Sequence, residues 1–77
     1  MPTVARIDGY RFFFFSNENE PPHIHVERAE CVAKFWLAPP ALASNVGFRS
    51  GELSELYRIV REQQVAFQER WDEHFGN

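Results

Sequence analysis

The sequence is poor in several features that mark whole classes of protein. Its 77 residues include one cysteine, Cys31, which cannot form an internal disulfide and excludes a cysteine-rich metal scaffold. No apolar run approaches the ~20 residues that a membrane helix needs, and the N-terminus lacks the basic start and apolar core of a signal peptide. We therefore expect a protein of the reducing cytoplasm, with no membrane partner.

Positive charge is also scarce, because eight Lys and Arg stand against eleven Asp and Glu, for a net charge of −3. This balance argues against a protein that is held to nucleic acid mainly by bulk positive charge. Aromatic residues, by contrast, are abundant, with eight Phe, two Trp and two Tyr. Since a chain this short buries only a thin core, large aromatic side chains help to supply the buried area. We expect a single domain over residues 1–77.

Residues 1–48 are predicted to form a small antiparallel sheet of about four strands. Asp8-Gly9 predicts a two-residue type I′ turn, because both turn positions need a positive φ. Strand pairing should continue outward from this turn on both sides. The expected pairs are Ile7 with Tyr10, Arg6 with Arg11, Ala5 with Phe12, and Val4 with Phe13.

Two further strands are predicted over residues 23–27 and 32–37, with a turn at Ala29-Glu30 between them. Pro39-Pro40 is expected to close the sheet, and residues 41–48 are left open between a short edge strand and irregular structure. The turn position fixes the register of the two strands. The expected pairs are His23 with Trp36, Ile24 with Phe35, and His25 with Lys34.

The segment 50–76 is predicted to form one long helix. Its apolar residues recur at helical spacing in a stripe about 100° wide, Ser50 suits the N-cap, and Gly76 suits the end. His74 falls on this stripe and is expected to be a partly buried structural histidine. The fold class is therefore α+β, with one C-terminal helix packed on one face of the sheet.

Alternation along the strands assigns the side chains to two faces of the sheet. The helix should cover the apolar face, and the opposite face should remain open. Basic groups interleaved with exposed aromatics are unusual for a face that only meets water, so the open face is the candidate site. The apolar face is predicted to carry Phe12, Phe14, Ile24, Val26, Ala33 and Phe35. The open face is predicted to carry Arg6, Arg11, Phe13, Phe15, His23, His25, Glu27, Lys34 and Trp36.

A first interpretation of the open face is a small ribonuclease. His23 or His25 would move protons, because the pKa of histidine lies near neutrality, and Lys34 would stabilise the developing phosphorane charge. Arg6 and Arg11 would hold phosphates while the aromatic rings stack on bases. This interpretation makes RNA a possible substrate in spite of the negative net charge.

A second interpretation is a divalent metal site. Side chains two positions apart on a strand point the same way, so His23, His25 and Glu27 supply two imidazoles and one carboxylate on one face. No other cofactor is expected. Strand alternation alone also explains both histidines, which leaves a purely structural role as the plain alternative.

A third interpretation is a protein-binding surface, because aromatic residues and arginine are enriched at binding hot spots. Phe13, Phe15 and Trp36 cannot lie under the helix together with the other face, and leaving them in water forfeits about 1.5–3 kcal/mol each. A homodimer or a small cognate protein should cover them, unless residues 16–22 or 39–48 fold back over them. The binding residues would be Arg6, Arg11, Phe13, Phe15 and Trp36.

The blocks that carry a family resemblance are residues 6–14, 21–26, 33–37, 45–48 and 71–76, which cover nearly the full length in order. Through these blocks the whole chain resembles a small bacterial family catalogued as domain of unknown function 4160. The resemblance implies one half of a compact two-gene module, in an arrangement similar to toxin–antitoxin pairs, with a cognate protein encoded nearby. Relatives commonly carry an acidic residue where this chain has Ala38. Together with the residues of the open face, this context predicts a toxin–antitoxin-like partner-binding protein. It would act as a small ribonuclease-type toxin through that face or, as the alternative, as a non-catalytic adaptor or metal-binding domain.

Overall fold

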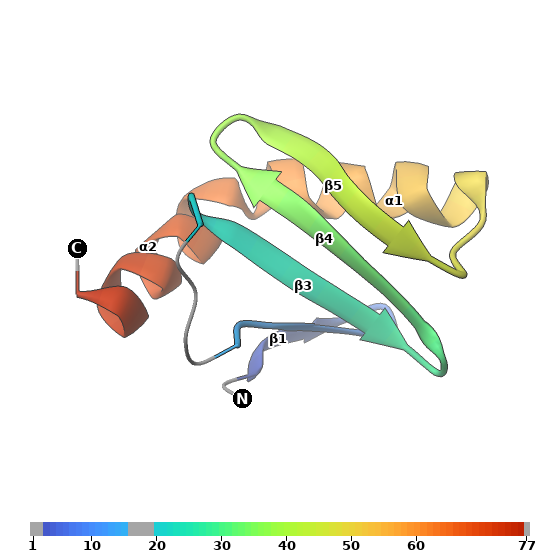
Figure 1. Cartoon of the computed structure of the whole chain (residues 1–77), viewed down its shortest axis with the longest axis horizontal. Helices are drawn as coiled ribbons and strands as arrows, with labels where there is room; N and C mark the ends of the chain where they lie inside the picture. The colour runs from blue at the N-terminus through green and yellow to red at the C-terminus, as the bar shows by residue number, and fades with distance from the viewer. Residues whose placement is uncertain (1–2, 16–19, 77) are drawn as a thin grey trace.

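Five antiparallel strands follow one another along the chain, and each is hydrogen-bonded to the next (Figure 1). The computed structural model describes residues 3–15 and 20–76. The α+β class is confirmed, although the sheet has five strands and the C-terminal segment forms two helices. The elements are β1 (Thr3–Ile7), β2 (Tyr10–Phe13), β3 (His23–Arg28), β4 (Cys31–Leu37), β5 (Pro40–Val46), α1 (Ser50–Glu62) and α2 (Gln64–Phe75).

The first hairpin turns where the sequence predicts it. Asp8 and Gly9 have φ values of 53° and 85°, as a type I′ turn requires, and Ile7 lies opposite Tyr10. The predicted pairing of Val4 with Phe13 is wrong, because the register shifts before Ala5 and brings Thr3 opposite Phe13. The predicted register of β3 and β4 is confirmed at all three pairs.

Pro39-Pro40 does not close the sheet. The peptide bond between Ala38 and Pro39 is cis and lies in the turn between β4 and β5, and Pro40 is the first residue of β5. A proline is tolerated at the start of an edge strand because no ladder hydrogen bond there needs its missing N–H. Residues 40–46 therefore add a fifth strand beside β4.

The predicted single helix is divided at Gln63, whose φ of −99° and ψ of 11° end α1 and precede α2. The side-chain amide of Gln64 then donates a hydrogen bond of 2.9 Å to the carbonyl of Leu37 at the end of β4. Ser50 is not the N-cap, because the extended residue before α1 is Arg49. The N–H of Arg49 donates to the carboxylate of Glu52 at 2.9 Å, and this hydrogen bond lowers the pKa of Glu52.

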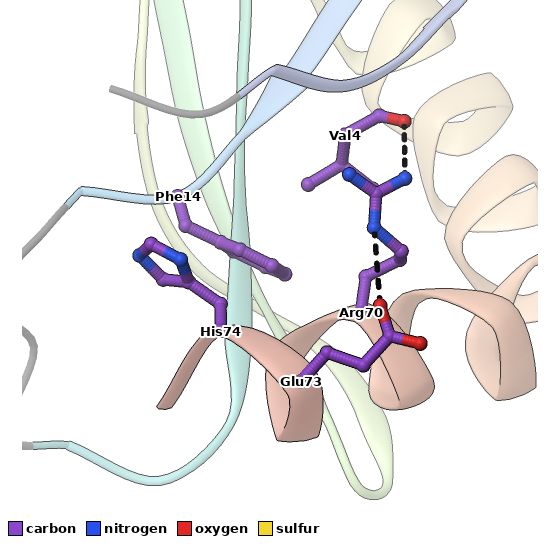
Figure 2. A pocket seen from close by; sticks show the side chains of 5 residues that line it. All are labelled: Val4, Phe14, Arg70, Glu73 and His74. Atoms are coloured by element: carbon purple, nitrogen blue, oxygen red, sulfur yellow. Dashed lines mark hydrogen bonds and ion pairs between the residues drawn. The ribbon is translucent and has the colours of Figure 1, made fainter. Parts of the chain in front are cut away.

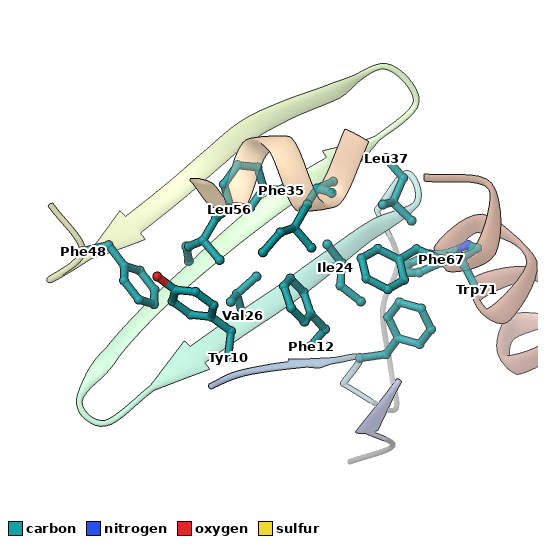
Figure 3. Close-up of a cluster of buried hydrophobic side chains, with 14 residues drawn as sticks. Tyr10, Phe12, Ile24, Val26, Phe35, Leu37, Phe48, Leu56, Phe67 and Trp71 are labelled. Atoms are coloured by element: carbon teal, nitrogen blue, oxygen red, sulfur yellow. The ribbon is translucent and has the colours of Figure 1, made fainter. Parts of the chain in front are cut away.

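Both helices lie on the same side of the sheet, with α1 behind β4 and β5 in Figure 1. Figure 3 shows the resulting core, in which Phe12 of β2 lies 5.3 Å from Phe67 of α2 between ring centroids. Phe14 meets Trp71 edge-on at 5.3 Å. The prediction that the helical segment covers the apolar face is confirmed. The buried core residues are Tyr10, Phe12, Phe14, Ile24, Val26, Ala33, Phe35, Leu37, Phe48, Leu56, Ile59, Val60, Phe67 and Trp71.

Candidate functional site

The sheet face opposite the helices, called the outer face below, is built from three rows of side chains that cross the strands. The register of neighbouring strands places the members of each row side by side. The first row consists of Arg11, Glu27, Val32 and Val46. The middle row consists of Phe13, His25, Lys34 and Ser44. The third row consists of Trp36 and Ala41, with His23 opposite Trp36 at the first position of β3.

His25 lies at the centre of the outer face and is half-buried by aromatic rings. Its ring stacks on Phe13 with centroids 5.5 Å apart, and Phe15 meets it edge-on at 4.5 Å. Lys34 occupies the opposite position on β4. These contacts hold the imidazole in one place on a rigid strand, beside a cation.

The expectation that Phe13 is left open to water is wrong, because only 3% of it is exposed. Its neighbours on the same face cover it: Phe15 meets it edge-on at 5.4 Å, and the guanidinium of Arg11 lies 4.5 Å above its ring. Trp36 is half-buried, with Nζ of Lys34 4.7 Å from its ring centroid. Of the three aromatics expected on this face, Phe15 is the one that remains exposed.

Of the two segments expected as alternative covers for the outer face, residues 39–48 do not fold back over it. Residues 39–48 supply β5, so they extend the sheet sideways. The other proposed cover, residues 16–22, is described only from Glu20 onward, and residues 16–19 lie outside the described part of the chain.

His23 is fully buried, so the prediction that it is displayed on the open face is wrong. Its Nδ1 lies 2.8 Å from the carbonyl oxygen of Pro21, and its ring packs 4.9 Å from Trp71 of α2. A molecule resting on the outer face does not reach this imidazole. Of the two histidines proposed for proton transfer, His23 is therefore buried and His25 is half-buried.

Two ion pairs link charged groups of the outer face. Arg11 donates to Glu27 on the next strand at 3.0 Å and to the hydroxyl of Thr3 at 2.9 Å. Lys34 pairs with Glu20. Arg6 is exposed on β1, directly opposite Arg11. The face is consequently less positive than its basic residues alone would suggest.

Glu20 is a residue of the site that sequence reasoning missed. It precedes Pro21-Pro22 in a loop, where no periodicity indicates the direction of a side chain. Ser44 and Val46 were missed for another reason, because their segment was not assigned to a strand. Val32 is predictable from the sequence, since strand alternation places it on the same side as Lys34 and Trp36.

A hollow of about 160 Å³ lies in the outer face between β2 and β5. Apolar side chains form much of its wall, and Phe15 and Val46 are 43% and 64% exposed there. Three polar tips, those of His25, Lys34 and Ser44, also line it. The hollow can therefore accept an apolar group and offer it a few hydrogen-bond partners.

The three residues proposed as metal ligands are not gathered round one point. Within residues 3–15 and 20–76, no three His, Cys, Asp or Glu side chains form a group that could hold a metal ion. Glu27 faces Arg11, while Nδ1 of His23 faces the carbonyl of Pro21. These described residues therefore contain no assembled set of ligands that would support the metal interpretation.

A second hollow, of about 210 Å³, lies where β1 meets α2 (Figure 2). Arg70 donates to the carbonyl of Val4 at 3.4 Å and lies 3.8 Å from the carboxylate of Glu73. His74 is exposed rather than partly buried as predicted, and its ring stacks on Phe14 at 6.0 Å. Because the guanidinium is engaged with the chain itself, this cluster attaches β1 to α2, and the outer face remains the candidate site.

Comparison with known proteins identifies a family without assigning an activity. A family model described as "Domain of unknown function (DUF4160)" matches residues 9–72, which include β2 to β5, all of α1 and most of α2. No curated protein and no solved structure matches the chain. In the part of the chain that is described, no helix has the length and apolar character needed to cross a membrane.

Proposed function

The chain belongs to the DUF4160 family, and because that description names no activity, we propose from the outer face that it is a partner-binding protein of the cytoplasm. Its partner is a small cognate protein that covers the hollow between β2 and β5. This proposal keeps the partner-binding part of the toxin–antitoxin-like arrangement that the sequence resemblance implies.

The observation that carries this proposal is the cluster of exposed apolar side chains on a face that neither helix covers. Phe15, Val32 and Val46 are all exposed large hydrophobic residues, and all three line the same hollow. Covering apolar surface stabilises a complex by roughly 25 cal/mol per Å² before the costs of association. The ion pairs Arg11–Glu27 and Lys34–Glu20 border this apolar centre, as a polar rim borders the core of a protein interface.

Replacing Val46 with glutamate is expected to weaken binding of the protein encoded by the neighbouring gene by about 10–100-fold, or ~1.4–2.8 kcal/mol. The new carboxylate would be buried against apolar groups without a partner when the complex forms. Isothermal titration calorimetry with the two purified proteins measures the change in Kd.

Val65 offers a matched control for this substitution. It is 68% exposed, close to the 64% of Val46, but it lies on α2, away from the outer face. Val65→Glu should therefore leave the Kd unchanged. Equal affinity for the Val46→Glu variant and the wild-type chain would contradict the proposal that the outer face is the interface.

A ribonuclease is the second candidate function, and one specific observation favours it. His25 and Lys34 are directly opposite one another on β3 and β4, and both line the hollow. Such a pair supplies one proton-transfer group and one cation for phosphate chemistry. Burial of His23 is the main argument against this candidate, because it leaves His25 without a second accessible histidine on the outer face.

The catalytic candidate predicts that production of the chain without its neighbour slows growth and cleaves cellular RNA. His25→Ala should then relieve both effects by at least about tenfold, since general acid–base groups typically contribute 10²–10⁴-fold. Growth curves and RNA gels provide the measurement. If wild-type and variant cells grow equally well and their RNA stays intact, the catalytic candidate fails and partner binding stands alone.

A further inference from the structure

The outer edge of β5 is free of other strands in the described part of the chain, and no charged side chain of β5 protects it. In the described part of the chain, β4 is the one strand hydrogen-bonded to β5, so the other edge of β5 has N–H and C=O groups available for another strand. Edge strands commonly carry charged residues that discourage such pairing. β1, at the opposite edge, carries Arg6, whereas Pro40–Val46 contains no charged residue.

Hollows border β5 on both faces of the sheet. Ser44 and Val46 of β5 line the hollow of the outer face. On the helix side, Leu42 lines a hollow of about 300 Å³ together with Tyr57 of α1, and both side chains are exposed. The remaining residues of this helix-side hollow are Phe35, Leu53 and Ser54.

This arrangement matches the geometry of an added strand. Successive side chains of a strand point to opposite faces of a sheet. A segment paired with β5 would therefore direct one side chain into the helix-side hollow and the next towards the outer hollow. Backbone hydrogen bonds would supply affinity, and the two hollows would select the side chains.

The charges beside β5 indicate what kind of segment fits. The guanidinium of Arg61 lies 5.6 Å from the ring centroid of Tyr57, which lines the helix-side hollow. Among residues 3–15 and 20–76, no ion pair of Arg61 is found. Neither β5 nor the lining of this hollow contains a carboxylate. An occupant that brings its own carboxylate would therefore be complementary, whereas the β5 strand of a second copy would bring none.

We propose that β5 accepts an extended segment of a different protein as a sixth strand of the sheet. The segment places a large apolar side chain against Leu42 and Tyr57, and it carries carboxylates that pair with Arg61. This inference rests on the proposed partner-binding function, and it names the part of the partner that docks and the chemistry of that part.

A synthetic peptide tests the inference without the partner. The probe is a nine-residue peptide in which leucine and threonine alternate between two flanking glutamates at each end, and the control peptide has lysine in place of every glutamate. Titration into the ¹⁵N-labelled chain should shift the amide resonances of β5 and α1. The glutamate peptide should bind at least tenfold more tightly than the lysine peptide.

Two controls make the result specific. Arg61→Glu should reverse the preference between the two peptides, while Arg58→Glu, on the same helix, should not, because Arg58 pairs with Glu62. A glutamate peptide that is N-methylated at every leucine and threonine should lose binding, since neither edge of its central segment can donate ladder hydrogen bonds.

Several results would overturn the inference. These are unshifted β5 amides at millimolar peptide, equal affinity for both peptides, full binding of the N-methylated peptide, or a dimer of the chain that Leu42→Lys dissociates in light scattering. The last result would assign the β5 edge to a second copy. If the peptide fails while Val46→Glu still blocks the cognate protein, the partner-binding function stands and docking through β5 is wrong.

Discussion

Replacing Phe12 with alanine is expected to lower the free energy of unfolding by about 3–5 kcal/mol. Phe12 is fully buried on β2, and its ring contacts Phe67, so it joins the sheet to α2. Native domains are stable by about 0.05–0.15 kcal/mol per residue, or roughly 4–12 kcal/mol for a chain of this length. The substitution would therefore remove a large part of the total stability. Urea unfolding followed by tryptophan fluorescence measures the loss.

Phe15→Ala is the matched control, because it removes the same number of atoms from a ring that is 43% exposed. Its cost should be no more than about 1.5 kcal/mol, since much of the ring already contacts water. If Phe12→Ala leaves too little folded protein to measure, Phe12→Leu retains part of the volume and should show a smaller loss in the same direction. Equal losses for Phe12→Ala and Phe15→Ala would contradict the burial described above.

His23→Ala is expected to lower the free energy of unfolding by about 2–4 kcal/mol, a structural effect rather than a catalytic one. The substitution removes a buried ring that packs against Trp71, and it leaves the carbonyl of Pro21 without its contact at 2.8 Å. His25→Ala should cost less, because that ring is half-buried. The same unfolding measurement compares the two variants.

The two histidine variants also separate a structural role from a chemical one. If production of the chain slows growth, a His23→Ala protein that unfolds like the wild type but leaves growth unaffected would contradict the structural assignment of His23. A protein that is destabilised, and that retains its effect on growth at low temperature, would agree with it.

Local signals account for the parts of the fold that the sequence predicts correctly. Asp8-Gly9 specifies its turn through backbone conformation alone, and the turn at Ala29-Glu30 sets the register of β3 and β4. The segment 40–46 gives no such signal, because Ala41, Ala43 and Ser44 are small and its register is shifted opposite β4. The helix break at Gln63 escapes prediction for a related reason, since the apolar stripe continues across it without a glycine or proline.

The candidate site shows a limit of face assignment. Alternation predicts the face of the sheet from which a side chain projects, but it does not predict which other residues cover that side chain. Phe13 starts on the outer face and is buried there by Arg11, Phe15 and His25. His23 lies at the first position of β3, where its ring packs against α2. Such placements depend on tertiary contacts, which a pattern within one strand does not contain.

The simple strand order has a consequence for how the chain folds. Every strand pairs with its neighbour in the sequence, so the sheet can grow one hairpin at a time without closing a long loop. Topologies dominated by such local contacts fold quickly. The helices that cover Phe12, Phe35 and the rest of the apolar face come last in the sequence. During synthesis, that apolar face must therefore stay exposed until residues 50–75 leave the ribosome, and this is the stage at which the chain is most prone to aggregate or to need a chaperone.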